Sequence, residues 1–215
     1  MSGQLPITMT ISNLLKFHYQ YHSSHILWLI ILLISFFLQA LDWVDGWRFN
    51  RGLVEQGDVW LLFSGHIVHL NWSHWLLNMA GLAIVAFFFS SHASFKQWFV
   101  VILLSACVIS AGLWWWMPDI HYYVGLSGVL HGLFLYGALR EIRFYPISGY
   151  VLVAVLLAKL SWEFFNGALP GSEDMAGGRV LTEAHLLGAI GGVFVWLLES
   201  LINAWKRVFR QKGKN

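Results

Sequence analysis

The sequence GLSGVLHG at residues 125–132 is the stretch from which the rest of the chain can be understood. It places Ser127 between Gly125 and Gly128 at the head of an otherwise apolar segment. The two glycines allow a tight turn and the close approach of another helix. A serine in this position serves either in a small-residue packing face, which is the commoner use, or as a nucleophile that needs a base. These eight residues alone favour the packing face, so the choice depends on the rest of the chain.

Composition identifies an integral membrane protein. The chain has 215 residues, of which 58% are hydrophobic and 11% are charged. A soluble domain carries roughly 25% charged residues. The length suits about six spanning helices of ~20 residues with short connections. The single cysteine offers no disulfide framework, and nothing in the composition suggests a nucleic-acid partner.

Six apolar segments are expected to cross the lipid bilayer as helices, at residues 26–41, 73–89, 95–117, 127–139, 147–165 and 183–204. An amphipathic arm, residues 1–25, precedes this core of residues 26–205, and a basic tail, residues 206–215, follows it. The first connection, about residues 43–72, mixes aromatic with charged side chains, which is typical of the water–lipid interface. The sequence therefore predicts an all-α polytopic membrane protein, a six-transmembrane-helix bundle with an interfacial first loop.

Lysine and arginine predict the orientation of this bundle, because their excess marks the cytoplasmic side. Nine of the thirteen lie in the N-terminal arm, in the turns at residues 90–97 and 140–143, or in the tail. Both termini are therefore expected in the cytoplasm. Ser127, which follows an odd number of crossings, is expected near the outer face.

Polar side chains within the apolar segments are the next feature, since each is costly in lipid unless it has a partner or a function. His74 and Asn78 are four residues apart and share one helix face. His185 lies at the outer start of the sixth segment, at a depth similar to that of Ser127 and His74. Small residues on the fourth and sixth segments would let the two helices touch and bring His185 to Ser127: Gly128, Gly132, Ala184, Gly188 and Gly192.

A serine with a histidine base is the minimal nucleophile pair. His74 and Asn78 could then donate to a developing oxyanion, where one donor is typically worth ~3–4 kcal/mol. Each residue also has a plainer use: Asn78 as a bond between helices, or His185 as an interfacial side chain bonded to a loop carbonyl. Their placement at one depth, together with Ser127, favours the catalytic interpretation.

The chain resembles the rhomboid family of intramembrane serine proteases over most of its length. The matching motifs are His-x-x-x-Asn at residues 74–78, Gly-x-Ser-Gly at residues 125–128 and Ala-His-x-x-Gly-x-x-x-Gly at residues 184–192. The resemblance implies a Ser127–His185 dyad without a third acidic member. It also implies an oxyanion hole from His74, Asn78 and the backbone N–H of Ser127. His69 matches a further histidine that the family often carries in the first loop.

Two departures refine the resemblance. The family's Trp-Arg pair in the first loop appears here as Trp60-Leu61, so the usual loop-anchoring arginine is missing at that place. His131 stands one turn after the serine, where an aromatic ring often stacks on the catalytic histidine. With the lead-in GHIVHL at residues 65–70, the chain is most similar to the rhombosortase branch. That branch implies substrates with a C-terminal Gly-Gly motif, a transmembrane helix and a basic tail, in the bacterial inner membrane.

Several alternatives use the same residues. His131 could act as the base, although it would point along its helix rather than across it. Lys159 could activate the serine, but an internal pair with Glu163, four residues on, is the simpler use. His66, His69 and His74 could suggest a metal site, but no carboxylate or thiol spacing completes a set, so no metal or cofactor is expected. Stacking or hydrogen bonding of His131 to His185 is favoured over its use as a base.

The sequence thus predicts a protease that cleaves a transmembrane segment near the outer face. Water would reach Ser127 through a polar cavity covered by the loop at about residues 170–179, and substrate would enter sideways past the fifth helix. One alternative is a non-catalytic protein of the same fold that binds membrane helices. Another is a small transporter, which predicts inverted repeats and broken helices that the sequence does not show.

Overall fold

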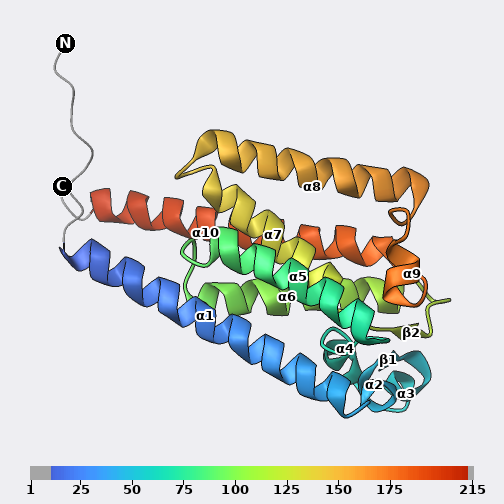
Figure 1. The fold of residues 1–215 in the computed structure, drawn as a ribbon. Coiled ribbons are helices and arrows are strands. Elements are labelled where there is room, and N and C mark those ends of the chain that lie inside the picture. The colour runs from blue at the N-terminus through green and yellow to red at the C-terminus, as the bar shows by residue number, and fades with distance from the viewer. Residues whose placement is uncertain (1–10, 213–215) are drawn as a thin grey trace.

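The protein is a helical bundle with one small sheet. The computed structural model describes the backbone of residues 11–212 and the side chains of residues 24–209. The long helices lie roughly along one direction, with the start of α1 and the end of α10 at the same end of the bundle (Figure 1). These helices are α1 (Ile11–Ala40), α5 (Trp72–Phe89), α6 (Phe95–Trp115), α7 (Ser127–Glu141), α8 (Pro146–Asn166) and α10 (Thr182–Lys212).

The short elements gather at the opposite end of the bundle (Figure 1). The first loop forms four of them, and the others lie before α7 and after α8. Strands β1 and β2 pair antiparallel, with Phe49 opposite Tyr123, and so tie the first loop to the segment that leads into α7. The short elements are α2 (Val44–Trp47), β1 (Phe49–Asn50), α3 (Arg51–Glu55), α4 (Leu61–Ser64), β2 (Tyr122–Tyr123) and α9 (Ser172–Ala176).

Local sequence signals mark several helix ends. The side chain of Asn71 accepts a hydrogen bond from the backbone N–H of His74 at 2.7 Å and so caps the start of α5. Gln97 accepts from the backbone N–H of Ser94 at 2.9 Å at the start of α6. α8 begins with Pro146, whose missing N–H costs nothing in a first turn, and ends at Gly167 with φ +80°.

Four of the described helices, α5, α6, α8 and the Thr182–Phe209 part of α10, are long and apolar enough to cross a membrane. The predicted count of six is therefore not confirmed. The apolar part of α1, Ser24–Ala40, and the 15-residue helix α7 are both shorter than a full span. α7 is buried along most of its length by other helices, so its length need not match the thickness of the lipid. The apolar helices nevertheless agree with the prediction of an integral membrane protein.

The core is built around α7. Its most extensive contact is with α10, and α6 packs against both. The largest fully buried side chains lie on α6, on α7, in the first loop and at the end of α5: Trp98, Tyr136, Phe49 and Phe89. α8 lies at one edge of the bundle, where it contacts α7 and, less extensively, α10 (Figure 1).

Two predicted boundaries do not coincide with helix ends. The arm assigned to residues 1–25 is helical from Ile11 and continues without a break into the apolar part of α1. The tail assigned to residues 206–215 continues α10 as far as Lys212. Residues 1–10 and 213–215 lie outside the described part of the chain. The described parts of the two polar ends, residues 11–25 and 206–212, are thus extensions of the first and last helices.

Candidate active site

The contact between α7 and α10 is made by backbone against backbone. A methyl group added at Gly188 would overlap the carbonyl group of Gly128, and one added at Gly192 would overlap the carbonyl of Gly132. A methyl at Gly128 would lie 2.8 Å from the carbonyl oxygen of Ala184. The structure therefore confirms that the small residues of these two segments face each other. We call this contact the glycine seam.

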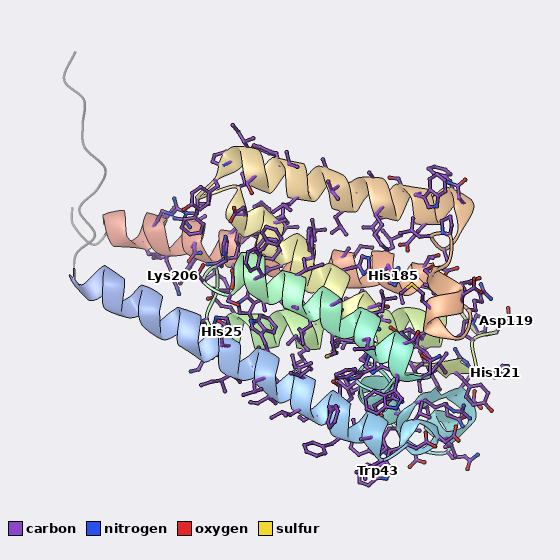
Figure 2. All side chains as sticks on the ribbon, viewed as in Figure 1. His25, Trp43, Asp119, His121, His185 and Lys206 are labelled. Carbon is purple, nitrogen blue, oxygen red and sulfur yellow. The ribbon has the colours of Figure 1, made fainter. Side chains whose placement is uncertain are left out.

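The glycine seam brings Ser127 and His185 together. Ser127 is the first residue of α7, and His185 lies in the first turn of α10. Ser127 Oγ lies 2.9 Å from His185 Nε2, so the hydrogen-bonding distance expected from the sequence is present. Figure 2 shows His185 nearer to the end of the bundle that holds Asp119 and His121 than to the end that holds His25 and Lys206.

The other ring nitrogen of His185 faces two charged groups of α8. Glu163 Oε2 lies 3.0 Å from His185 Nδ1, and the carboxylate is buried. Lys159 Nζ lies 2.6 Å from Glu163 Oε1 and 3.4 Å from His185 Nδ1. The predicted Lys159–Glu163 pair is therefore present. The resemblance implied a dyad without an acidic member, and the contact of a carboxylate with the histidine adds a neighbour that it did not include.

The sequence points to Glu163 as a buried charge but does not predict its contact with His185. The signal was a carboxylate on an apolar helix, which is costly in lipid and must find partners. The pairing with Lys159 follows from their spacing on α8, since residues four apart share a helix face. The contact with His185 depends on how α8 lies against α10, and no spacing along the chain encodes that.

His131 packs flat against His185. The ring centroids are 4.1 Å apart with an angle of 15° between the ring planes, so the stacking favoured from the sequence is present. His131 Nδ1 lies 2.7 Å from the backbone oxygen of Ser127, to which it donates a hydrogen bond. This bond fixes the imidazole along its own helix. The arrangement gives no support to His131 as the base for Ser127.

His74 and Asn78 face the serine from α5. His74 lies beside Gly125, because a methyl group at Gly125 would be 2.9 Å from His74 Nε2. Asn78 Nδ2 donates to the backbone oxygen of His74 at 3.0 Å, and both side chains line the same cavity as Ser127. Two N–H-bearing side chains thus border the space next to the hydroxyl. Their predicted role in binding an oxyanion stays a prediction.

The turn before Ser127 depends on Gly125. Its φ of +115° is a conformation that residues with a side chain rarely adopt, and its neighbour His74 leaves no room for one. The backbone N–H of Gly125 donates to the carbonyl of Gly65 at 2.9 Å, and Tyr123 donates its hydroxyl hydrogen to the Gly125 carbonyl at 3.1 Å. The first loop therefore holds the residues that lead into the serine.

Arg51 anchors the first loop to the end of α6. It is 8% exposed, and its guanidinium group donates hydrogen bonds to four backbone carbonyls. Leu61 occupies the place where the resemblance led us to expect an arginine, so the anchor comes from a different position in the same loop. The carbonyls belong to Leu113, Trp114, Met117 and Ile120.

Two buried histidines in the first loop are held neutral. Burial lowers the pKa of His66 to about 4, and its Nε2 lies 3.1 Å from Ser110 Oγ. Burial, and to a lesser extent the nearby His74, lowers the pKa of His69 to about 3. The His69 ring meets the edge of the His74 ring at 5.1 Å. His69 therefore supports His74 by packing, which fits its predicted place beside the site.

Potential metal ligands also gather at the serine. Among the described residues, His131, Glu163 and His185 offer ligand atoms that lie within 4.8 Å of one another. Both ring nitrogens of His185 and both carboxylate oxygens of Glu163 already contact protein groups. The trio of His66, His69 and His74 does not form such a group in the described part of the chain. The hydrogen bonds present match a proton-transfer site better than an ion site.

A cavity of about 650 Å³ opens onto these residues. Its walls come from α5, α7 and α8, and from the segment between α8 and α10, which Asn71 holds by donating to the Ala176 carbonyl at 3.3 Å. The predicted loop at residues 170–179 does border the cavity. The cavity is less polar than predicted, because most of its lining is apolar. The apolar lining includes Leu77, Ile84, Leu130, Phe134, Val155 and Leu156.

A comparison with protein-family models finds a match. The model described as "Rhomboid domain" matches residues 56–201, which is about two thirds of the chain. The matched range contains Ser127, His185, His74, Asn78 and Glu163. No curated protein and no solved structure gives a significant match.

Proposed function

Because the chain belongs to the rhomboid family, whose members are in general intramembrane serine proteases, we propose that it is an active protease of this type. The observation that carries the proposal is the 2.9 Å distance between Ser127 Oγ and His185 Nε2. A nucleophile and its base within hydrogen-bonding distance are what acyl transfer by serine requires. A non-catalytic protein of the same fold that binds membrane helices would have no need of this pair.

In the proposed reaction, Ser127 Oγ attacks the scissile carbonyl carbon and its proton passes to His185 Nε2. The resulting tetrahedral intermediate collapses, the C–N bond breaks, and His185 gives its proton to the leaving amine. Water then attacks the acyl-enzyme with His185 again as base, which releases the new carboxyl terminus and restores Ser127. The cavity beside Ser127 gives both substrate and water a place next to the hydroxyl.

The oxyanion in this scheme would be bound by His74, Asn78 and the backbone N–H of Ser127. Both side chains line the cavity with Ser127, which supports this assignment. A single oxyanion donor is worth about 10²–10³ in kcat in a water-excluded site. Asn78 would exchange its intrahelical bond to the His74 carbonyl for a bond to the oxyanion, a bond that gains value only as negative charge develops.

In the lipid bilayer, the six long helices would form the six-crossing core, with both termini in the cytoplasm and the active site near the outer face. The bias of lysine and arginine along the sequence supports this orientation. α7 has 15 residues, so it is about 22 Å long, shorter than the ~30 Å hydrocarbon layer. Ser127, at its first residue, would thus lie below the outer surface, in the inner membrane of a bacterium.

The proposed substrate is a secreted protein with a C-terminal Gly-Gly motif, an apolar helix and a basic tail. The rhombosortase-like sequence at residues 125–132 and 65–70 supports this choice. The segment would enter between α5 and α8, since both helices line the cavity and α8 packs loosely at the edge of the bundle.

The test is co-expression with a Gly-Gly-tailed substrate and measurement of tail release. Ser127→Ala and His185→Ala are each expected to lower release by at least about 10³-fold, because neither the nucleophile nor its base can be replaced by its partner. Exposed residues provide matched controls: Ser200→Ala and His121→Ala should release the tail at the wild-type rate. Labelling of Ser127 by a fluorophosphonate should follow the same pattern.

Two outcomes separate the parts of this proposal. Tail release at the wild-type rate by both Ser127→Ala and His185→Ala would show that the protein does not use them for proteolysis. Fluorophosphonate labelling without tail release would keep the protease and reject the Gly-Gly substrate. Stable capture of the tailed substrate without labelling or cleavage would instead identify a non-catalytic helix-binding protein.

A further inference from the structure

We propose that Glu163 is a positioning residue that completes a Ser127–His185–Glu163 triad, an inference that rests on the proteolytic function proposed above. The carboxylate lies 3.0 Å from His185 Nδ1, on the side of the ring opposite the serine. It is 5% exposed, so water screens it little. Its role is to hold the proton of His185 on Nδ1 and to stabilise the imidazolium that forms when the serine attacks.

The two neighbours of His185 Nδ1, Glu163 and Lys159, favour different tautomers of the histidine ring. Glu163 Oε2 can only accept a hydrogen bond, so its contact needs a proton on Nδ1 and leaves Nε2 free to accept the proton of Ser127. Lys159 Nζ can only donate, so a bond from it to Nδ1 would place the ring proton on Nε2, where it blocks proton transfer. Glu163 is closer, at 3.0 Å against 3.4 Å for Lys159. The geometry therefore favours the productive tautomer.

Lys159 then acts on Glu163 rather than on the histidine. Its ammonium group lies 2.6 Å from Oε1, while the other oxygen, Oε2, faces His185. This bond holds the carboxylate in place and offsets the cost of burying its charge. It also fixes the side chain so that one oxygen points at the ring. A chain of contacts thus runs from Lys159 through Glu163 and His185 to Ser127.

The acid belongs to a different structural unit from the serine and the histidine. Ser127 and His185 lie on the two helices of the glycine seam, whereas Glu163 and Lys159 lie on α8, which packs less closely. Movement of α8 away from α10 would break the contact between Glu163 and His185 without separating Ser127 from its base. The position of α8 therefore determines whether Glu163 contacts His185. A substrate that enters past α8 and moves this helix would change that contact as well as occupy the site.

The principal test is Glu163→Gln in the purified full-length protein, assayed on a tailed substrate. The amide can donate to Nδ1 and so selects the wrong tautomer, which can lower kcat by as much as about 10⁴-fold in a serine protease triad. We expect kcat to fall at least about 100-fold with KM unchanged. Glu199→Gln is the matched control, since Glu199 pairs with Arg140 at 2.8 Å far from the serine and should change kcat little.

A second measurement separates positioning from folding. Glu163→Ala leaves space beside the cavity for formate, which should restore kcat by at least about tenfold in a concentration-dependent way, because formate supplies the missing carboxylate. Formate should not restore Ser127→Ala. If the single variants do not fold, the double variant Lys159→Met/Glu163→Gln removes both charges and avoids an unpaired lysine in the bundle. It is expected to fold and to have the same low kcat.

The outcomes are distinguishable from those of the function itself. A wild-type protein that is neither labelled by fluorophosphonate nor able to cleave would reject the protease. Normal cleavage by the wild type together with normal kcat in Glu163→Gln would reject only the triad. A rise in KM with unchanged kcat, or no rescue of a folded Glu163→Ala by formate, would also count against the role of Glu163 in positioning His185.

Discussion

The glycine seam and α8 hold the two halves of the candidate site in different ways. In the seam, the backbones of α7 and α10 touch, and a single added methyl group at Gly188 has no room. α8 lies at the edge of the bundle, with most of its surface away from the core and only three buried apolar or small positions, Gly149, Leu156 and Leu160. The glycine seam fixes Ser127 and His185, and α8 supplies Glu163.

The difference shows where precision is needed and where motion is allowed. Close-packed backbones cannot shift by a small amount without losing contact, so the distance between nucleophile and base is held constant. A helix with few buried contacts can move at low cost, and elements that move to admit ligands are generally of this kind. The site combines a rigid pair with an adjustable third member.

Among changes that compare the seam with the rest of the bundle, the largest expected effect comes from adding one methyl group to the seam. Gly188→Ala places a Cβ into the carbonyl of Gly128 and forces α7 and α10 apart. A misplacement of about 1 Å can cost about 100-fold in rate, and we expect kcat to fall by at least that amount. Gly46→Ala adds the same methyl group where nothing lies within 4 Å, and it should leave kcat unchanged. Equal activity of the two variants would mean that the seam does not set the catalytic distance.

A smaller effect is expected from the loop that positions the rigid pair. Arg51→Met removes the hydrogen bonds to four carbonyls in the last turn of α6 and in the segment that follows it, and should destabilise the protein by about 1–3 kcal/mol. Arg48→Met is the matched change, because Arg48 pairs with the exposed Asp45 at 3.0 Å, and such a pair contributes less than about 1 kcal/mol. Thermal unfolding in detergent measures both. A similar Tm for the two variants would show that Arg51 is not the anchor.

The smallest effect is expected where the same methyl group is added to α8. Gly149→Ala places a Cβ against the backbone nitrogen of Ile142, in the turn between α7 and α8, so this contact is also made to backbone. Because α8 is free to shift at the edge of the bundle, we expect kcat to change less than about tenfold, or about 1.4 kcal/mol. Steady-state cleavage by Gly149→Ala and Gly188→Ala compares the two regions directly. A loss as large in Gly149→Ala as in Gly188→Ala would show that α8 is as rigidly held as the seam.

Much of the fold was accessible from the sequence because helix periodicity and apolar length act locally. The predicted segments at residues 73–89, 95–117, 127–139 and 147–165 match helices of the structure to within a few residues. The count of six spans could not be confirmed in this way, since α7 is short and enclosed by other helices. The thickness of the lipid sets the length of a helix that contacts it, and this constraint is weak for α7 because other helices enclose it.

The sequence alone determined which residues could carry the chemistry. Gly128, Gly188 and their neighbours predicted close packing of two helices, and that packing brought His185 to Ser127. The sequence also provided Lys159 and Glu163 as a pair, because residues four apart on a helix are always neighbours. These inferences hold because spacing along one helix fixes geometry whatever surrounds it.

The tertiary structure alone decided several contacts between separate elements. It placed Glu163 against His185 and took the loop anchor from Arg51 instead of the expected position at residue 61. Each of these contacts joins elements that are distant along the chain or fixes a side-chain rotation. These contacts depend on the packing of the whole bundle. That packing is determined by many side chains together, so the spacing of residues along one helix does not predict it.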